Sequence, residues 1–282
     1  MSRTVYVNGA YLSEDEATVS IFDRAFLFAD GVYEVTAVVD GRLVDFEAHM
    51  ARLHRSLGEM EMASPISDGE YAAMHRELID RNDLAEGIVY MQVTRGAADR
   101  DFAFPDESKP TLIGFTQVKS LTNSELAKSG VNVVTLPDIR WKRRDIKSTA
   151  LLAQALTKEV AKQRGAFEGW MVEDGFVTEG TSSSAFIVWD GATIVTRPLS
   201  NEILPGVTRR AILRLAENTE LEVDERPFSV DEVKAAGEAF LTSASSFVLP
   251  VVEIDGVQIG DGKPGPVTEM FRRLYLEEAR RG

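Results

Sequence analysis

Cysteine is absent from the 282-residue chain. The fold therefore has no disulfide, no thiolate metal ligand and no cysteine nucleophile, and we expect no metal ion. Positive charge is scarce as well, because 31 lysine and arginine residues stand against 45 aspartate and glutamate residues, a formal net charge of −14. An acidic surface repels the phosphates of nucleic acids and anionic lipids, so we expect neither nucleic acid nor a membrane as a partner.

Long apolar runs are also missing. None approaches the roughly 18 residues that a membrane-spanning helix needs. The first residues, Met1 to Tyr6, do not contain the apolar segment of a secretory signal. We therefore expect a soluble, cytoplasmic protein.

The chain does contain enough apolar material for a large core, since 44% of its residues are hydrophobic. Single cores tend to divide above about 250 residues, which predicts two domains. A polar stretch over 119–130 holds only isolated apolar residues and is the predicted linker. It separates an N-terminal domain over 1–118 from a C-terminal domain over 131–282.

The N-terminal domain is predicted to be α+β with a mainly antiparallel sheet. Asn8-Gly9 and Asp40-Gly41 are strong hairpin-turn signals flanked by β-rich residues. Apolar residues spaced by three and four indicate helices between the strands. The predicted strands are 4–7, 10–12, 31–39, 42–45, 88–95 and 111–118, and the predicted helices are 47–61 and 68–82.

The C-terminal domain is predicted to contain short strands separated by glycine turns, with helices among them. Its predicted strands are 131–136, 170–173, 176–178, 185–189, 193–196, 238–242 and 251–254, and its predicted helices are 148–164, 208–217 and 230–236.

Basic residues cluster once, from Arg140 to Lys147, with Lys142, Arg143 and Arg144 between them. Such a local cluster suits a small anionic ligand better than a polymer, although a solvated basic surface accounts for the pattern equally well. Neighbouring cations favour the neutral, nucleophilic form of one amine among them. Lys147, just before the helix predicted from residue 148, is the candidate.

Three further segments are candidates for binding a small phosphorylated ligand. Glu179 precedes a glycine and a run of hydroxyl residues, although a solvated turn would look the same. The turn at Gly206 to Thr208 enters a predicted helix, whose first amides can bind phosphate, or Thr208 can simply cap it. Residues 242–246 offer hydroxyls and amides after a strand, and Arg52 on the early helix can add charge.

Six segments, in this order, resemble those of the fold-type IV enzymes that use pyridoxal 5′-phosphate (PLP). Within this branched-chain-aminotransferase-like superfamily the similarity is to D-amino-acid transaminases, and it runs over nearly the whole chain. It implies a two-domain α+β fold, with an N-terminal α/β sandwich, a C-terminal β-barrel-like domain and the cofactor between them. The segments are 28–35, 92–96, 138–141, 145–148, 178–184 and 250–256.

The resemblance implies a set of cofactor-binding residues. Lys147 matches the lysine that forms the Schiff base with PLP and moves the substrate proton, and Glu179 matches the partner of the pyridine nitrogen. Leu204 matches the residue that packs against the ring, and Arg140 a cation near the phenolate side. The remaining matches, mainly around the phosphate, are Arg52, Ser183, Gly206, Val207, Thr208, Ser243, Ala244 and Ser245.

The resemblance also implies the substrates and how they are held. D-amino acids and 2-oxo acids would exchange an amino group in a ping-pong reaction, with Tyr33 and Ser182 lining the site. Arg100 matches an arginine that grips the substrate carboxylate across a homodimer interface. Well-known members have a histidine two residues after it, where this chain has Phe102. Losing that hydrogen bond to a charged group costs about 1.5–3 kcal/mol.

Three alternatives stay open at this stage. A branched-chain L-amino-acid aminotransferase and an aminodeoxychorismate lyase share the fold and the lysine. A non-catalytic binding protein on the same fold is the third. The sequence of residues 30–35 and the loop around Arg100 favour the D-type enzyme over the branched-chain enzyme. The presence of both Lys147 and Glu179 favours an enzyme over a binding protein.

Overall fold

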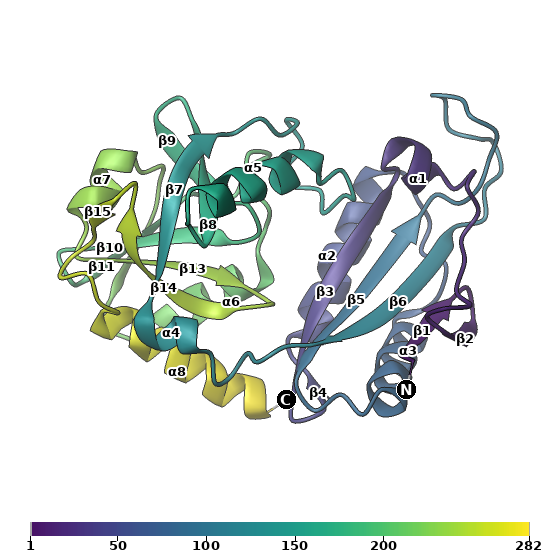
Figure 1. Cartoon of the computed structure of the whole chain (residues 1–282), viewed down its shortest axis with the longest axis horizontal. Helices are drawn as coiled ribbons and strands as arrows, with labels where there is room; N and C mark the ends of the chain where they lie inside the picture. Colours follow the sequence, from purple (N-terminus) through teal and green to yellow (C-terminus); the bar gives the residue numbers. More distant parts are fainter. Residues whose placement is uncertain (1, 282) are drawn as a thin grey trace. The chain divides into compact units, whose positions relative to one another are not determined.

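The computed structural model describes residues 2–281 and divides them into two compact units (Figure 1). The first unit contains the chain up to Ser120 together with Ile146–Ala150, and the second contains Leu121–Asp145 and Leu151–Arg281. The predicted boundaries differ from this division in two respects. Residues 121–130, predicted to be part of a linker over 119–130, lie in the second unit and contain helix α4 (Glu125–Ser129). The short segment Ile146–Ala150 lies with the first unit because its backbone pairs with a strand there.

The first unit is built on a six-stranded antiparallel sheet, in the order β2-β1-β6-β5-β3-β4. Both predicted hairpin turns form, since Asn8-Gly9 and Asp40-Gly41 all have positive φ, as tight hairpins require. The strands are β1 (Thr4–Val7), β2 (Ala10–Ser13), β3 (Gly31–Val39), β4 (Arg42–Leu43), β5 (Gly87–Thr94) and β6 (Thr111–Val118), and the helices are α1 (Arg24–Phe28), α2 (Phe46–Glu59) and α3 (Asp68–Arg81).

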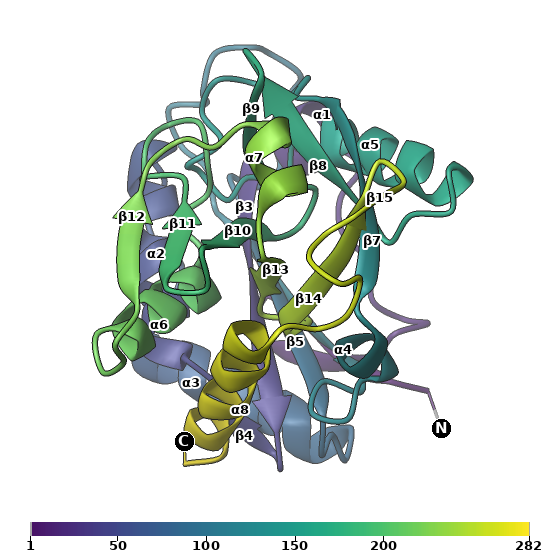
Figure 2. The ribbon, with the colours of Figure 1, turned by 90° about the vertical axis from the view of Figure 1, so that its left-hand side faces the viewer.

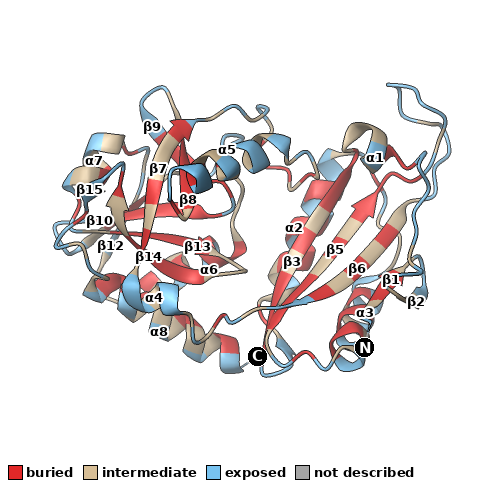
Figure 3. Cartoon of the chain, in the orientation of Figure 1, coloured by how far each residue is buried: buried red, intermediate tan, exposed pale blue. Residues whose placement is uncertain are grey.

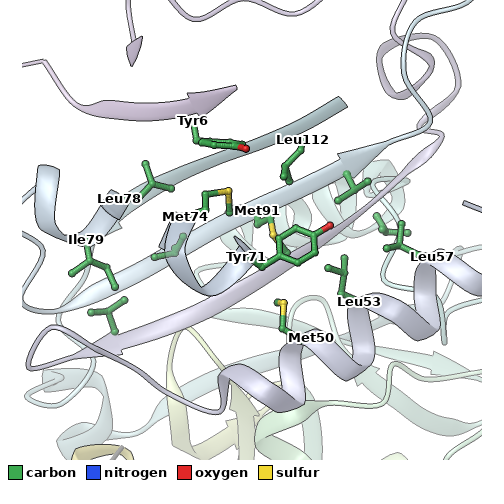
Figure 4. Packing of buried hydrophobic residues seen from close by; sticks show 14 of the residues in the cluster. Tyr6, Met50, Leu53, Leu57, Tyr71, Met74, Leu78, Ile79, Met91 and Leu112 are labelled. Carbon is green, nitrogen blue, oxygen red and sulfur yellow. The ribbon is translucent and has the colours of Figure 1, made fainter. Parts of the chain in front are cut away.

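One face of this sheet is covered by α2 and α3 (Figure 4). The apolar residues of α2 that recur at spacings of three and four, Met50, Leu53 and Leu57, are all buried against it. The other face carries partly exposed aromatic rings, with Tyr90 stacked between Tyr33 and Phe115 at centroid distances of 5.5 and 4.7 Å. Alternation along β3 therefore separates the core from a face that carries a predicted site residue, Tyr33.

His75 on α3 is fully buried in the first unit, where its ring meets the edge of Phe46. Its Nδ1 lies 2.8 Å from the Tyr71 carbonyl oxygen. Burial lowers the pKa of His75 from its ordinary 6.5 to about 4. Between pH 6.5 and pH 4, His75 is therefore protonated in the unfolded chain but neutral in the folded chain. The free energy of unfolding consequently decreases as the pH falls from 6.5 towards 4.

This predicts a pH-dependent difference between the parent protein and His75→Gln. The histidine should remove about 2 kcal/mol of unfolding free energy between pH 7 and pH 5, and the variant should lack that part of the slope. Urea unfolding of both proteins at several pH values measures it. Parallel curves for the two proteins would show that His75 does not titrate in this way.

The second unit is built on a nine-stranded mixed sheet (Figure 2). Eight strands follow the order β12-β11-β10-β13-β14-β7-β8-β9, and β15 pairs with β14. The sheet curls, since its edge strand β9 also contacts β10. The strands are β7 (Val131–Pro137), β8 (Glu168–Glu173), β9 (Phe176–Gly180), β10 (Ser184–Trp189), β11 (Thr193–Thr196), β12 (Glu222–Glu225), β13 (Glu238–Ser243), β14 (Phe247–Ile254) and β15 (Val257–Gln258).

Five helices accompany this sheet, and its central strands are buried along most of their length (Figure 3). Residues from β10, β13 and β14 form the core together with Trp170 and Phe228. The helices are α4 (Glu125–Ser129), α5 (Leu152–Gln163), α6 (Val207–Ala216), α7 (Val230–Ala235) and α8 (Pro266–Arg281). Within residues 2–281 we find no helix with the length and hydropathy to cross a membrane.

One predicted helix begins in the wrong place. The sequence predicted a helix from Ser148, but α5 starts at Leu152. Residues before it are extended instead: Ser148 bridges Val32, and the Thr149 amide donates to the Gly31 carbonyl at 2.9 Å. Pairing with β3 therefore outweighs local helix propensity at this point.

Candidate active site

Glu179, near the end of β9, is a buried carboxylate with two kinds of donor. The Leu204 amide donates to both of its oxygens, at 3.2 and 3.3 Å, and the Arg140 guanidinium donates to Oε1. Burial raises the pKa of Glu179, while the Arg140 charge and the Leu204 amide oppose that shift. The carboxylate is thus held at one defined position inside the second unit.

Arg140 is itself fixed by a carboxylate that sequence reasoning did not single out. Asp138 accepts from Arg140 Nη2 at 2.7 Å and from Nε at 3.0 Å, a two-bond arrangement that sets the plane of the guanidinium. The Thr178 hydroxyl donates to the same Asp138 at 2.7 Å. The observed ion pairs of Arg140 are thus with Asp138 and Glu179, and its predicted contact with the cofactor stays a prediction.

Glu168 on β8 is a second carboxylate that the sequence did not reveal. It is 1% exposed and accepts from the Thr181 hydroxyl, the Ser182 amide and the Ser182 hydroxyl, each at 2.9 Å, and from the Ser183 hydroxyl. These bonds pin the loop that follows Glu179. Because the hydroxyl protons of Ser182 and Ser183 point at Glu168, both hydroxyls offer only acceptor lone pairs to a ligand.

The predicted phosphate residues of the second unit lie together. Gly206 is the N-cap of α6 and has no side chain to bond the first amides of the helix. A β-carbon at Gly206 would come within 2.7 Å of the Ser184 hydroxyl, and Ser184 pairs with Thr242 across β10 and β13. The turn at Gly206 to Thr208 therefore adjoins the segment that begins at Thr242.

Two buried hydroxyls in this region lack partners. Among residues 2–281, Thr208 Oγ1 and Thr242 Oγ1 are buried without a hydrogen bond, and such orphans are rare. The Ser243 hydroxyl meets that of Ser246 at 2.6 Å and that of Ser245 at 3.4 Å. An uncapped helix N-terminus beside spare hydroxyls has the donor set that a phosphate group requires.

Lys147 lies in the first unit, on the extended segment Ile146–Ala150, which pairs with the beginning of β3. Its carbonyl accepts from the Tyr33 amide at 3.0 Å, and its own amide donates to the Ser56 hydroxyl at 3.3 Å. The Nζ lies 4.2 Å from the centroid of the Tyr33 ring. Two predicted site residues, Lys147 and Tyr33, are therefore in contact. Among the residues that the structure describes, no carboxylate forms an ion pair with Lys147.

Arg52 on α2, predicted to bind phosphate, forms a buried pair with Glu34 of β3. The two Arg52–Glu34 bonds measure 2.8 and 2.7 Å, and His49 Nδ1 lies 2.8 Å from the same carboxylate. Burial alone would raise the pKa of Glu34, but the Arg52 guanidinium and His49 hold it far below its ordinary value. Glu34 is a further contact that sequence reasoning missed, and it fixes where the Arg52 side chain points.

Arg100 is exposed and lies against two phenyl rings that also contact each other, with a centroid distance of 5.5 Å. Its guanidinium carbon is 5.4 Å from the centroid of Phe28 and 5.5 Å from that of Phe102. Phe102 is 78% exposed. No carboxylate among residues 2–281 forms an ion pair with Arg100.

Residues 31–254 match the family described as amino-transferase class IV, and the chain belongs to this family. The predicted family, fold class and enzymatic class are thereby confirmed.

Several known proteins are similar to this chain. It is 39% identical over 272 residues to a D-alanine aminotransferase of Staphylococcus haemolyticus, covering 96% of each chain. The solved structure of a branched-chain amino acid aminotransferase from Escherichia coli has a TM-score of 0.87 and 24% identity, covering 98% of this chain and 94% of that one. The PLP-bound form of a hypothetical aminotransferase from Mycobacterium tuberculosis has a TM-score of 0.85 and 24% identity, covering 98% of each chain.

Proposed function

We propose that this aminotransferase uses PLP to exchange the amino group between D-amino acids and 2-oxo acids in a ping-pong reaction. The observation that carries the proposal is Glu179, a buried carboxylate whose neighbour Leu204 leads directly into the uncapped turn at Gly206. The Leu204 amide thus ties an acid for a ring nitrogen to the segment that leads into the proposed phosphate turn. The Staphylococcus haemolyticus relative, a D-alanine aminotransferase, supports the choice of substrate.

PLP, when bound, supplies a ring that withdraws the electrons released as a substrate Cα–H bond breaks. The residues present fit such a group. Glu179 would bond the ring nitrogen and Leu204 would pack against the ring. The phosphate would be held by the turn from Gly206 to Thr208, by Ser243 to Ser245, and by the charge of Arg52, with Ser183 and Arg140 supporting nearby.

The protein side of the chemistry is assigned to three groups. Glu179 would bond the protonated ring nitrogen, and the Arg140 charge favours the ionised form of Glu179 and orients it. Lys147 Nζ would hold the cofactor, and the same amine would move the proton from the substrate Cα.

The substrate carboxylate is assigned to Arg100, with Tyr33 and Ser182 as further substrate contacts. An exposed guanidinium can bind a carboxylate with two bonds. We further propose a homodimer in which Arg100 serves the neighbouring site. Large apolar residues stand exposed in the same unit and support this, namely Ile21, Phe22, Phe26 and Phe102. The cytoplasmic location stays a prediction.

A panel of half-reactions tests the proposal. The protein loaded with PLP is mixed with D-alanine, L-alanine, D-glutamate or L-leucine, and loss of the visible absorption of the bound cofactor is followed. We expect rapid loss with the D-amino acids. Loss with L-leucine but not with D-alanine would favour the branched-chain alternative, because this chain shares its fold with the Escherichia coli branched-chain enzyme.

Phe102 offers a smaller test of substrate binding. Replacing Phe102 with histidine restores a hydrogen-bond donor beside Arg100, and we expect the KM for D-alanine to fall about tenfold. Steady-state kinetics measures this. The control is Val118→His, which places the same side chain at an 81% exposed position at the end of β6 and should leave the KM unchanged. An unchanged KM in Phe102→His would mean that residue 102 does not face the carboxylate.

A further inference from the structure

Residues 95–105, which we call the Arg100 loop, leave β5 and contain no helix or strand of their own. A loop without regular structure takes its conformation from the side chains that contact it. Its first part is tied to α1, because Asp23 bridges Ala97 and the Arg24 amide donates to the Gly96 carbonyl at 2.9 Å. The part that carries Arg100 needs a separate anchor.

Arg24, the first residue of α1, reaches that part of the loop. Its side chain is 3% exposed. Its Nη1 donates to the carbonyl oxygens of Asp101 at 2.7 Å and Ala103 at 3.3 Å, the residues on either side of Phe102. Its Nε donates to Asp30 at 2.7 Å. One buried guanidinium therefore links the start of α1 to the backbone directly after Arg100.

The charge balance explains why the loop is held. Arg95, also buried, donates to the same oxygen of Asp30 at 2.8 Å, so two guanidinium groups share one carboxylate. A buried cation is costly unless nearby groups compensate its charge. The carbonyl dipoles of Asp101 and Ala103 supply part of that compensation for Arg24. The ring of Phe104 also contacts both cations, at 3.5 Å from Arg95 and 5.7 Å from Arg24.

We infer that Arg24 is a positioning residue for substrate recognition. By fixing the carbonyls of Asp101 and Ala103, it holds Arg100 in the orientation set by the two rings that it contacts, ready to bind the substrate carboxylate. An arginine held in this way loses less conformational freedom when the substrate binds. The inference rests on the proposed role of Arg100, but Arg24 itself touches neither substrate nor cofactor.

The test begins with Arg24→Lys, which keeps the charge beside Asp30 but has a single nitrogen and cannot also reach both carbonyls. We expect the KM for D-alanine to rise about tenfold while kcat stays within about twofold. Hydrogen exchange of residues 97–104 should also become faster. The matched control is Arg3→Lys, because Arg3 likewise joins a carboxylate, Glu14, to a carbonyl, that of Thr116, in the same unit. It should change neither quantity.

A double-mutant cycle with Arg100→Ala separates this role from a merely structural one. Arg100→Ala should raise the KM more than Arg24→Lys does, and combining the two should add nothing further. Two outcomes would overturn the inference about Arg24 but leave the proposed role of Arg100 standing. The first is that the two substitutions have additive effects on KM. The second is that Arg100→Ala raises the KM while Arg24→Lys leaves it unchanged. An unchanged KM in Arg100→Ala would instead overturn the proposed carboxylate contact, and the inference with it.

A second variant keeps the test decisive if Arg24→Lys does not fold. Phe104→Leu removes the ring that contacts both guanidinium groups, at a position that is 51% exposed and tolerant of change. A cation–π contact contributes less than the bonds of Arg24, so we expect a KM increase of about threefold and faster exchange over 97–104. Normal exchange and a normal KM would count against the anchored loop.

Discussion

Lys147→Ala should abolish amino-group transfer. The side chain is assigned two tasks, carrying the cofactor and moving the substrate proton, and no other lysine is predicted to share them. Loss of a positioned acid–base group alone lowers turnover by about 10²–10⁴-fold, and loss of the covalent attachment adds to this. A coupled assay with D-alanine and 2-oxoglutarate, following pyruvate, measures the loss.

The control for this prediction is Lys162→Ala, which removes an exposed lysine from α5 and should keep full activity. The cofactor should still bind Lys147→Ala through the phosphate contacts around Gly206, but dialysis should remove it more easily. Thermal unfolding checks that both variants fold. Near-normal turnover by Lys147→Ala would overturn the assignment of its role.

Most of the fold follows from local signals in the sequence. The Asn8-Gly9 and Asp40-Gly41 turns predict their hairpins because few other residues accept positive φ at adjacent positions. Helix α8 was not predicted, although Val267, Phe271, Tyr275 and Ala279 recur every four residues and are buried. There the signal was present, since this spacing places all four on one helical face.

Other features depend on contacts that local sequence does not show. The start of α5 was misplaced because Ser148 and Thr149 pair with β3, more than 110 residues earlier in the chain. By contrast, the turn at Gly206 that leads into α6 was predictable from local signals, whereas its binding of phosphate stays a prediction.

Three carboxylates of the candidate site were also missed, because their partners are distant in the sequence. Glu34, Asp138 and Glu168 were not predicted to have roles, because a sequence reveals an acid but not what it will contact. Glu34 meets its arginine 18 residues away, and Glu168 meets the Ser182 amide 14 residues away. Each of these acids accepts several bonds and sets the position of a residue that was predicted.

Glu179→Gln should slow transfer severely while leaving the fold intact. The amide has the same shape and can still accept from Leu204, and Arg140 keeps its two bonds to Asp138. What the variant loses is the negative charge. A neutral amide cannot hold a proton on the ring nitrogen, so the electrons released at the substrate Cα are stabilised far less. Removing one electrostatic contact of this kind lowers kcat by about 10²–10³-fold.

The matched control is Glu173→Gln, because Glu173 at the end of β8 also binds an arginine, Arg144 at 2.7 Å, but has no assigned part in the reaction. We expect it to keep kcat within about twofold. Binding of PLP, followed by its absorption, should be weakened only modestly in Glu179→Gln, since the phosphate contacts remain. A kcat near that of the parent would show that Glu179 does not control the ring nitrogen. A severe loss in both variants would instead point to a general disturbance of the β8–β9 hairpin, which unfolding measurements on the two proteins would reveal.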